Sequence, residues 1–218
     1  MGIKFMMDGH DRRAKYFHLL HVTSLSFFLA LAINGFVTEF LKNRIGKFRP
    51  DFLQRCGPKV SEDDGTGFNH VYNETICSMP LGASVFKDGY KSCPSGHSSF
   101  AWCGLTFFNL WISGQFKLHA PVDPDSKSIE SSGNSRYHRF RLAQLINLLP
   151  LCLCLQIAVS RSEDYRHDFI DISLGSLIGL ATSVIVYSQF FRSIFSYYCS
   201  ETKFSDYQLL QSYEDIPV

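Results

Sequence analysis

Three short polar clusters hold the residues of this sequence that are best suited to chemistry. They lie at residues 42–50, 94–97 and 160–171, and together they supply basic side chains, two histidines and an aspartate. The residues concerned are Lys42, Arg49, Ser95, Gly96, His97, Arg161, His167 and Asp171. Cations, imidazoles and a carboxylate in one site suit an anion whose reaction needs proton transfer, and a phosphate monoester dianion fits that description.

Each of these residue types has a defined use in phosphate chemistry. An arginine can bind two phosphate oxygens at once, and a lysine adds a point charge. One histidine can attack phosphorus while a second protonates the departing oxygen. His167 and Asp171 are four residues apart, so on a helix they share a face, where the carboxylate could bond one imidazole nitrogen and fix the tautomer. A helix starting near residues 94–97 would add backbone N–H groups that bind anions.

Taken singly, each cluster also has an ordinary explanation. Residues 42–50 are typical of the basic flank of a membrane helix, whose lysines and arginines reach the interface. Residues 94–97 are typical of a helix start, and the His167–Asp171 pair is typical of an interfacial polar contact. The catalytic interpretation therefore requires a fold that brings the three clusters together.

Four apolar stretches supply the elements that would position the clusters. They carry no Asp, Glu, Lys or Arg over about the thickness of a bilayer core, which roughly 20 helical residues cross. The four stretches are residues 17–38, 98–116, 142–160 and 172–191. Four buried helices of a soluble protein are the alternative, which this many apolar runs in 218 residues disfavours. The sequence therefore predicts an all-α integral membrane bundle with four spans.

Four spans place all three clusters on one side of the membrane. The chain ends and the basic segment 117–141 share the other side, which their Lys and Arg residues near the spans assign to the cytosol. The predicted organisation is a cytosolic N-terminus at 1–16, a membrane domain at 17–191 with lumenal loops at about 39–97 and 161–168, and a cytosolic tail at 192–218. Asn73 begins an Asn-Glu-Thr sequon in the first lumenal loop and is a candidate N-glycosylation site.

Composition bounds the class of protein further. A chain of 218 residues suggests one domain, and a net charge of +1 gives no reason to propose a nucleic acid partner. The seven cysteines include no metal-type Cys-x-x-Cys pair. Cys56, Cys77 and Cys93 share the long polar loop, and two of them could form a disulfide in an oxidising lumen. The sequence alone leaves the pairing open.

The three clusters together resemble the motifs of the type 2 phosphatidic acid phosphatase superfamily. The matching patterns are Lys-x6-Arg-Pro from Lys42, Pro-Ser-Gly-His from Pro94 and Ser-Arg-x5-His-x3-Asp from Ser160. The stretches 49–56 and 95–100 are similar to the lipid phosphate phosphatase branch, especially to fungal diacylglycerol pyrophosphate and phosphatidate phosphatases. This resemblance covers about residues 17–191 and implies a metal-independent phosphatase without a cofactor.

The resemblance also implies a role for each matched residue. His167 would attack phosphorus and form a phosphohistidine, Asp171 would hold its imidazole, and His97 would protonate the leaving oxygen and then activate water. The phosphate would be bound by Lys42, Arg49, Ser95, Gly96 and Arg161. The expected substrates are phosphatidate, lysophosphatidate and diacylglycerol pyrophosphate, and the bilayer is the other expected partner.

The branch that this chain resembles has a membrane core of six spans, two of which precede the equivalent of residues 17–38. We therefore expect the first two spans to be absent from this chain. The resemblance suggests an endomembrane such as Golgi or vacuole, or the plasma membrane, with the active site facing the lumen or exterior. The resemblance does not fix the oligomeric state, and a homo-oligomer is compatible with it.

Other functions remain open at this stage. The same chemistry could act on a polyprenyl diphosphate or a sugar phosphate, and a truncated chain could bind lipid phosphates without catalysis. Intact His97, His167 and Asp171 argue against a non-catalytic role. A vanadate-dependent haloperoxidase would use the same residues, but those proteins are soluble, and the four predicted spans argue against one.

Overall fold

The computed structural model shows an all-α protein, as the sequence predicts. It describes residues 2–59, 74–121 and 133–203. The elements are α1 (Gly2–Ile45), α2 (Phe52–Cys56), the short 3₁₀ helix η1 (Glu74–Ile76), α3 (Ala83–Asp88), α4 (Gly96–Gln115), α5 (Gly133–Ile146), α6 (Leu149–Glu163) and α7 (Phe169–Phe190). Within these ranges the β pairings are two isolated bridges, Pro58 with Cys77 and Phe191 with Thr202.

In the described part of the chain, three helical segments are long and apolar enough to cross a membrane. They are Lys15–Ile45, Phe140–Glu163 and Phe169–Phe190. The predicted span 98–116 forms most of α4, but it is not among the three. Buried polar side chains such as Ser98, Ser99 and Thr106 make α4 less apolar. The protein is thus an all-α membrane bundle, and the count of four spans stays a prediction.

Helix α1 extends beyond the predicted first span at both ends. Its 44 residues correspond to about 66 Å of helix, roughly twice the thickness of a bilayer core. Residues 2–16, which we expected as a separate polar N-terminus, continue the same helix. Their assignment to the cytosol, like that of residues 192–218, stays a prediction, and residues 204–218 lie outside the described part of the chain.

The predicted third span contains a break that the apolar pattern does not reveal. Helix α5 ends at Ile146 and α6 begins at Leu149, with Pro150 in the first turn of α6. Proline has no N–H for a helical hydrogen bond, so it favours a new helix start at this point. Asn147 lies in the break and donates its side-chain N–H to Ser113 Oγ on α4 at 2.7 Å. The break is therefore tied to the neighbouring helix by the side-chain N–H of Asn147.

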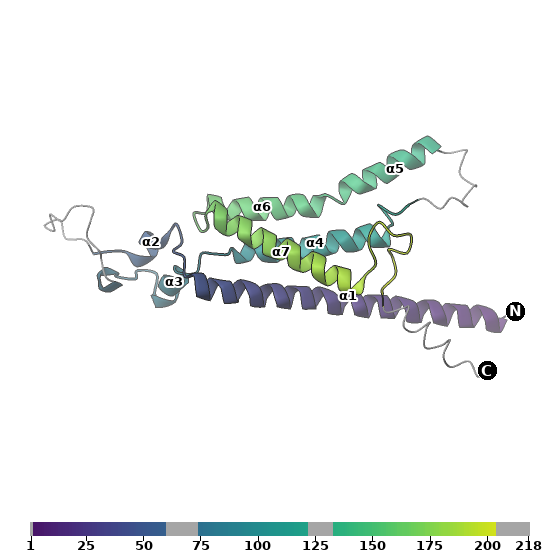
Figure 1. Cartoon of the computed structure of the whole chain (residues 1–218), viewed down its shortest axis with the longest axis horizontal. Helices are drawn as coiled ribbons and strands as arrows, with labels where there is room; N and C mark the ends of the chain where they lie inside the picture. Colours follow the sequence, from purple (N-terminus) through teal and green to yellow (C-terminus); the bar gives the residue numbers. More distant parts are fainter. Residues whose placement is uncertain (1, 60–73, 122–132, 204–218) are drawn as a thin grey trace.

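Helix α4 lies at the centre of the bundle. It packs most extensively against α7 and also contacts α6 and α1 (Figure 1). The end of α1, helices α2 and α3, the start of α4 and the α6–α7 turn gather at one end of the molecule (Figure 1). The opposite end holds the start of α1 and the end of α7. This arrangement brings the three polar clusters to the same end, as the sequence predicts.

Small residues allow α4 and α7 to approach closely. A Cβ atom on Gly179 would lie 2.1 Å from the carbonyl oxygen of Ser99, and one on Gly175 would lie 2.4 Å from that of Ser95. Both distances are far below any van der Waals contact. On α7, the four-residue series Asp171, Gly175, Gly179 and Ser183 is buried, and His167 just before the helix is buried too. Small residues that recur every four positions predict the face on which membrane helices pack closely, and this face of α7 is the buried one.

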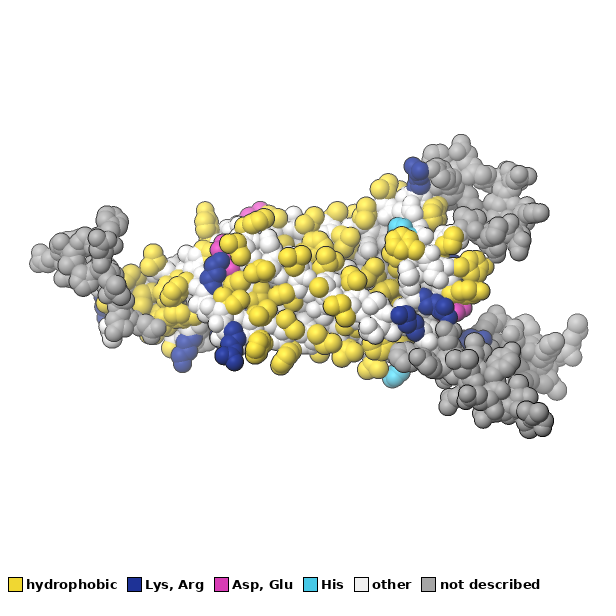
Figure 2. All heavy atoms as spheres, in the orientation of Figure 1, with side chains coloured by type: hydrophobic (Ala, Val, Ile, Leu, Met, Phe, Trp, Pro, Cys, Tyr) yellow, Lys and Arg dark blue, Asp and Glu magenta, His cyan; other side chains and the backbone are white. Residues whose placement is uncertain are grey.

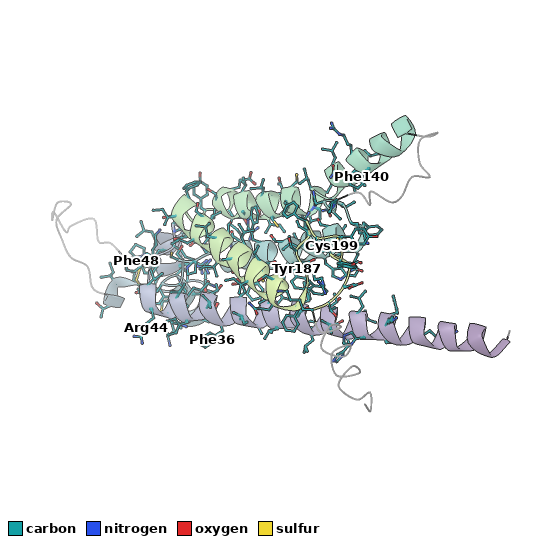
Figure 3. The ribbon with its side chains drawn as sticks, turned by 45° about the vertical axis from the view of Figure 1, so that its right-hand side comes forward. Phe36, Arg44, Phe48, Phe140, Tyr187 and Cys199 are labelled. Carbon is teal, nitrogen blue, oxygen red and sulfur yellow. A yellow bond between two sulfur atoms is a disulfide. The ribbon has the colours of Figure 1, made fainter. Side chains whose placement is uncertain are left out.

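Aromatic rings fill the bundle at the end opposite the polar clusters. Phe107 of α4 packs edge-on against Tyr187 of α7, and Tyr187 stacks on Phe191 with ring centroids 4.9 Å apart. Tyr187 and Cys199 both lie against Gly114 near the end of α4, where Cys199 Sγ donates to the Gly114 carbonyl (Figure 3). This packing anchors the end of α7 away from the site.

The surface carries the apolar side chains expected of a membrane protein. Phe28 and Phe36 on α1 are 66% and 72% exposed, and Phe169 at the start of α7 is 80% exposed. Hydrophobic side chains cover the middle of the visible face, whereas the visible charged and histidine side chains lie towards its two ends (Figure 2). A band of exposed apolar groups between polar ends matches the hydrocarbon core between its two interfaces.

Candidate active site

Lys42 connects the first cluster to the second. It lies in the last turn of α1, and its Nζ would be 3.0 Å from a Cβ atom added at Gly96. The ammonium group therefore sits over the first residue of α4, where helix N–H groups and the helix dipole attract anions. Lys42 Nζ also pairs with Glu39 at 3.0 Å, and the Glu39 side chain is largely exposed. The absence of a side chain at Gly96 leaves room for this lysine.

Ser95 caps helix α4 and ties it to α7. Its side chain accepts a hydrogen bond from Ser98 N, the N-cap role typical of serine. Its backbone N–H donates to the Asp171 carbonyl at 2.9 Å, so the starts of the two helices are joined directly. The predicted contact of Ser95 with phosphate stays a prediction, because the fully buried hydroxyl is engaged in the cap.

His167 and Asp171 come together, but they are not in direct hydrogen-bond contact. The distance from His167 Nδ1 to Asp171 Oδ2 is 3.7 Å, which is too long for a hydrogen bond. The hydroxyl of Ser92 lies between them: it donates to Asp171 Oδ2 and is 3.4 Å from His167 Nδ1. All three side chains are buried. The sequence alone did not indicate Ser92, because one serine in a polar loop carries no distinctive signal.

Lys47 is a second residue that sequence analysis did not single out. Its Nζ pairs with Asp168, and it also donates to Asp171 Oδ1 at 2.9 Å. Asp168 in turn caps α7 through a reciprocal capping box with Asp171. Burial alone would lower the pKa of Lys47, but the hydrogen bonds to Asp168 and Asp171 outweigh it and raise the pKa. Lys47 thus bridges two carboxylates at the start of α7.

Arg49 is buried and held in place by α3. Its guanidinium donates to both the side chain and the backbone carbonyl of Asp88, each at 3.1 Å. The same carboxylate accepts from Arg55 at 3.1 Å, and Arg55 also pairs with Asp51 at 2.9 Å. Asp88 lies 39 residues from Arg49 in the chain, so no local spacing could have indicated the pair. Two arginines and two aspartates therefore form one network beside the site.

Arg161 lies at the end of α6 and is joined to His167 by a backbone hydrogen bond. Its carbonyl accepts from the backbone N–H groups of Arg166 and His167, at 3.2 and 3.3 Å. Its guanidinium pairs with Asp164 at 3.0 Å and contacts the hydroxyl of Ser160. The side chain is partly exposed, so this cation remains accessible at the end of the bundle.

The two histidines share a positive environment. Burial lowers the pKa of His167 to about 4, and the charges of Arg49 and Lys42 contribute, while Asp171 opposes them. The pKa of the exposed His97 is also lowered, first by partial loss of contact with water and then by the charges of Arg161, Lys42 and Arg49. Lys42 and Arg49 thus act on both imidazoles. Among residues 2–59, 74–121 and 133–203, no group of three or more His, Cys, Asp or Glu side chains could hold a metal ion.

We expect the protein to lose stability as the pH falls from about 6.5 towards 4. In this window the unfolded chain protonates His167, whose ordinary pKa is 6.5, whereas the folded imidazole has a pKa of about 4 and stays neutral. The unfolded state then binds more protons, so the free energy of unfolding falls as the pH falls and is fully restored above the unfolded pKa. The pKa difference corresponds to an effect on the order of 2–4 kcal/mol.

Thermal unfolding in detergent would measure this effect at several pH values for the wild type and for His167→Gln. The variant has no imidazole at this position, so its stability should depend less on pH between about 6.5 and 4. An equal pH dependence in both proteins would contradict a depressed pKa at His167.

A disulfide fixes the loop that carries Arg49 and Arg55. Of the three cysteines whose pairing the sequence left open, Cys56 and Cys77 are bonded and Cys93 is free and buried. Burial, and then the charge of Asp171, raise the pKa of the Cys93 thiol to about 11. Asn73, the candidate glycosylation site, lies outside the described residues.

Comparison with known proteins gives matches over most of the chain. A sequence profile of the PAP2 superfamily matches residues 23–195. A probable diacylglycerol pyrophosphate phosphatase 1 of Schizosaccharomyces pombe is 37% identical over 72% of this chain and 49% of its own length. Diacylglycerol pyrophosphate phosphatase 1 of Saccharomyces cerevisiae is 32% identical over 84% of this chain and 56% of its own length.

A plant relative is similar to the same degree. Lipid phosphate phosphatase 2 of Arabidopsis thaliana is 35% identical over 79% of this chain and 52% of its own length. The chain therefore spans about half the length of the curated relatives it matches. No solved structure matches it.

Proposed function

This chain belongs to the PAP2 superfamily, and on that premise we propose that it removes phosphate from lipid phosphates, using His167 as the nucleophile. The substrates would be phosphatidate, lysophosphatidate and diacylglycerol pyrophosphate, in keeping with relatives named diacylglycerol pyrophosphate phosphatase and lipid phosphate phosphatase. One observation carries the proposal: at one end of the bundle, Lys42 and Arg49 lie close enough to both histidines for their charges to act on both imidazoles.

The first step forms a covalent intermediate. The lone pair of His167 Nε2 attacks phosphorus, an N–P bond forms, and the bond between phosphorus and the leaving oxygen breaks. The leaving oxygen is the lipid ester oxygen in phosphatidate and lysophosphatidate, and the bridging oxygen that stays with phosphatidate in diacylglycerol pyrophosphate. The departing oxygen takes a proton from His97 and leaves as a neutral hydroxyl group. His167 keeps its proton on Nδ1, so the phosphohistidine carries a positive ring near the buried carboxylate of Asp171.

The second step regenerates the enzyme. His97, now neutral, accepts a proton from a water molecule as that water attacks phosphorus. The N–P bond breaks, inorganic phosphate forms, and the electron pair returns to His167 Nε2. The exposed position of His97 in the first turn of α4 suits a residue that must reach both the leaving group and water.

Fixed cations would stabilise the charge on the transferring phosphoryl group. Lys42 lies on α1, Arg49 in the segment after it and Arg161 on α6, and all three lower the pKa of His97 through their charge. Such groups stabilise a phosphoryl-transfer transition state without reorganisation when they are held in advance. We therefore propose that the reaction needs no divalent metal ion.

The phosphate itself would restore the proton on His97. Partial loss of contact with water and the neighbouring cations lower the pKa of this imidazole, which favours its neutral form. A bound dianion would offset those positive charges and raise the proton affinity of His97. Substrate binding would thus convert His97 into the general acid that the first step requires.

We propose that the site faces an oxidising compartment, either an endomembrane lumen or the cell exterior. The Cys56–Cys77 disulfide supports this orientation, because disulfides persist in such compartments and are rare in the cytosol. Residues 1–16 and 192–218 would then face the cytosol.

The test is phosphate release by the chain reconstituted in lipid vesicles that contain phosphatidate, with excess EDTA present. We expect release to continue in EDTA at the rate seen without it. Release that stops in EDTA and returns with Mg²⁺ would overturn the metal-independent mechanism. No release from correctly inserted protein on any of the three lipids would overturn the proposed function of this chain.

A further inference from the structure

Asp171 is separated from the imidazole that it is expected to orient. Its Oδ2 atom lies 3.7 Å from His167 Nδ1, whereas Ser92 Oγ lies 3.4 Å from the same nitrogen. The Ser92 hydroxyl also donates to Asp171 Oδ2, so it contacts both groups. The relative exposure of residues Ser92 and Asp171 is 0%, and that of His167 is 3%, so water competes little with these contacts.

Both carboxylate oxygens of Asp171 accept hydrogen bonds from donors other than the imidazole. Oδ1 accepts from Lys47 Nζ at 2.9 Å, and Oδ2 accepts from the backbone N–H of Asp168 at 3.4 Å as well as from Ser92. The carboxylate is therefore surrounded by donors from three parts of the chain. Its charge is compensated even though its nearest approach to His167 exceeds hydrogen-bond length.

A hydroxyl between a carboxylate and an imidazole fixes the direction of both hydrogen bonds. An ionised carboxylate only accepts, so the Ser92 hydrogen must point at Asp171. The lone pairs of Ser92 Oγ are then left for the imidazole, and Nδ1 must be the donor. A proton on Nδ1 leaves the lone pair of Nε2 free to act as a nucleophile.

We propose that Ser92 is a positioning residue that transmits the effect of Asp171 to His167 through two hydrogen bonds. In the first, His167 Nδ1–H donates to Ser92 Oγ, and in the second, the Ser92 O–H donates to Asp171 Oδ2. This inference rests on the proposed function, in which His167 Nε2 attacks phosphorus. No proton leaves these two hydrogen bonds during the reaction. The hydroxyl only holds the reactive tautomer and stabilises the positive ring of the phosphohistidine.

The main chain holds Ser92 at this place. Its backbone N–H donates to the Lys47 carbonyl at 3.0 Å, which links it to the residue whose side chain binds the other oxygen of Asp171. The backbone of Ser92 also forms a hydrogen bond with the His167 ring, which raises the pKa of the imidazole. Replacement of the hydroxyl alone would therefore leave the loop and the backbone contact in place.

The kinetic test compares Ser92→Ala with Ser113→Ala in the full chain. Ser113 is also a buried serine, and its hydroxyl accepts from Asn147 at 2.7 Å at the far end of the bundle. We expect Ser92→Ala to lower kcat by about 10- to 100-fold, as loss of a histidine's orienting partner does at metal sites, with KM nearly unchanged. Ser113→Ala should keep the wild-type kcat. Equal kcat values for the two variants would overturn the proposal.

A double-mutant cycle identifies the route of the effect. If Asp171 acts on His167 through Ser92, the variant carrying both Ser92→Ala and Asp171→Asn should be no slower than Asp171→Asn alone. Two losses that multiply would mean that Asp171 and Ser92 act independently, which would overturn the chain of hydrogen bonds.

A spectroscopic test does not depend on turnover. Nitrogen NMR of protein with ¹⁵N-labelled histidine reports which ring nitrogen carries the proton, and His167→Gln identifies the signal of His167. We expect the proton on Nδ1 in the wild type and a weaker preference for this tautomer in Ser92→Ala, in which the backbone contact of Ser92 remains. A proton on Nε2 in the wild type, or no change in Ser92→Ala, would overturn the role of Ser92. If the chain releases no phosphate, the proposed function fails and this measurement still decides the role of Ser92.

Discussion

His167→Ala is expected to abolish phosphate release, with a loss of at least about 10³-fold in kcat. No other described imidazole could replace it, because His97 lies at the start of α4 and is needed as the acid and base. The buried position of His167 means that alanine leaves space beside Ser92 and Asp171. His167→Gln fills this space without restoring a nucleophile, so it should be equally inactive.

His119→Ala is the matched control for this prediction. His119 is exposed beyond the end of α4, at the opposite end of the bundle, and its ring lies 6.0 Å from that of Phe195. This variant should keep the wild-type rate. Rapid quenching with radiolabelled substrate would add a direct readout: an acid-labile phosphoprotein should form in the wild type and be absent from both His167 variants. Labelling of His167→Gln would show that another residue is the nucleophile.

Gly179→Ala is expected to destabilise the protein by about 3 kcal/mol or more, at the upper end of overpacking effects. The new Cβ atom would lie 2.1 Å from the Ser99 carbonyl oxygen and 2.9 Å from the Cys103 backbone nitrogen. Both neighbours are backbone atoms of α4, so no side-chain rotation can relieve the overlap. Helices α4 and α7 would have to move apart.

Gly104→Ala provides the control, since it makes the same change within α4, another helix of the same bundle. A Cβ atom at Gly104 would meet only side-chain carbons of Leu31 and Phe27, at 3.8 and 3.9 Å, which is ordinary contact. Alanine is also favoured over glycine inside a helix by up to about 1 kcal/mol, so this variant should be neutral or slightly stabilised. Denaturation in mixed micelles would compare the two. Equal stability of both variants would contradict the close approach of α4 and α7.

The sequence predicted the features that repeat or that belong to one continuous segment. The apolar runs indicated the helices, and counting spans placed the three clusters at one end, where Lys42 does lie against Gly96. The four-residue spacing from His167 through Gly179 indicated the buried face of α7. These signals are local in the chain, so no tertiary contact has to be known to see them.

The contacts around the site could not be predicted, because they join segments that are distant in the chain. The Ser92–Asp171 bond spans 79 residues, and the pairing of Arg49 with Asp88 spans 39. Serine and aspartate are common in polar loops, so neither residue stands out by type. The bonded pair Cys56–Cys77 was one of three pairings that the loop allowed. Only the fold selects among such options.

The carboxylate of Asp88 has a consequence for how fast the product leaves. It already binds the guanidinium groups of Arg49 and Arg55, and with Asp51 the four charges cancel. A phosphate that reaches Arg49 must share this arginine with Asp88, so it is held less tightly than by an isolated cation. Inorganic phosphate would therefore have a shorter residence time, and product inhibition would be weaker, than the number of arginines alone suggests.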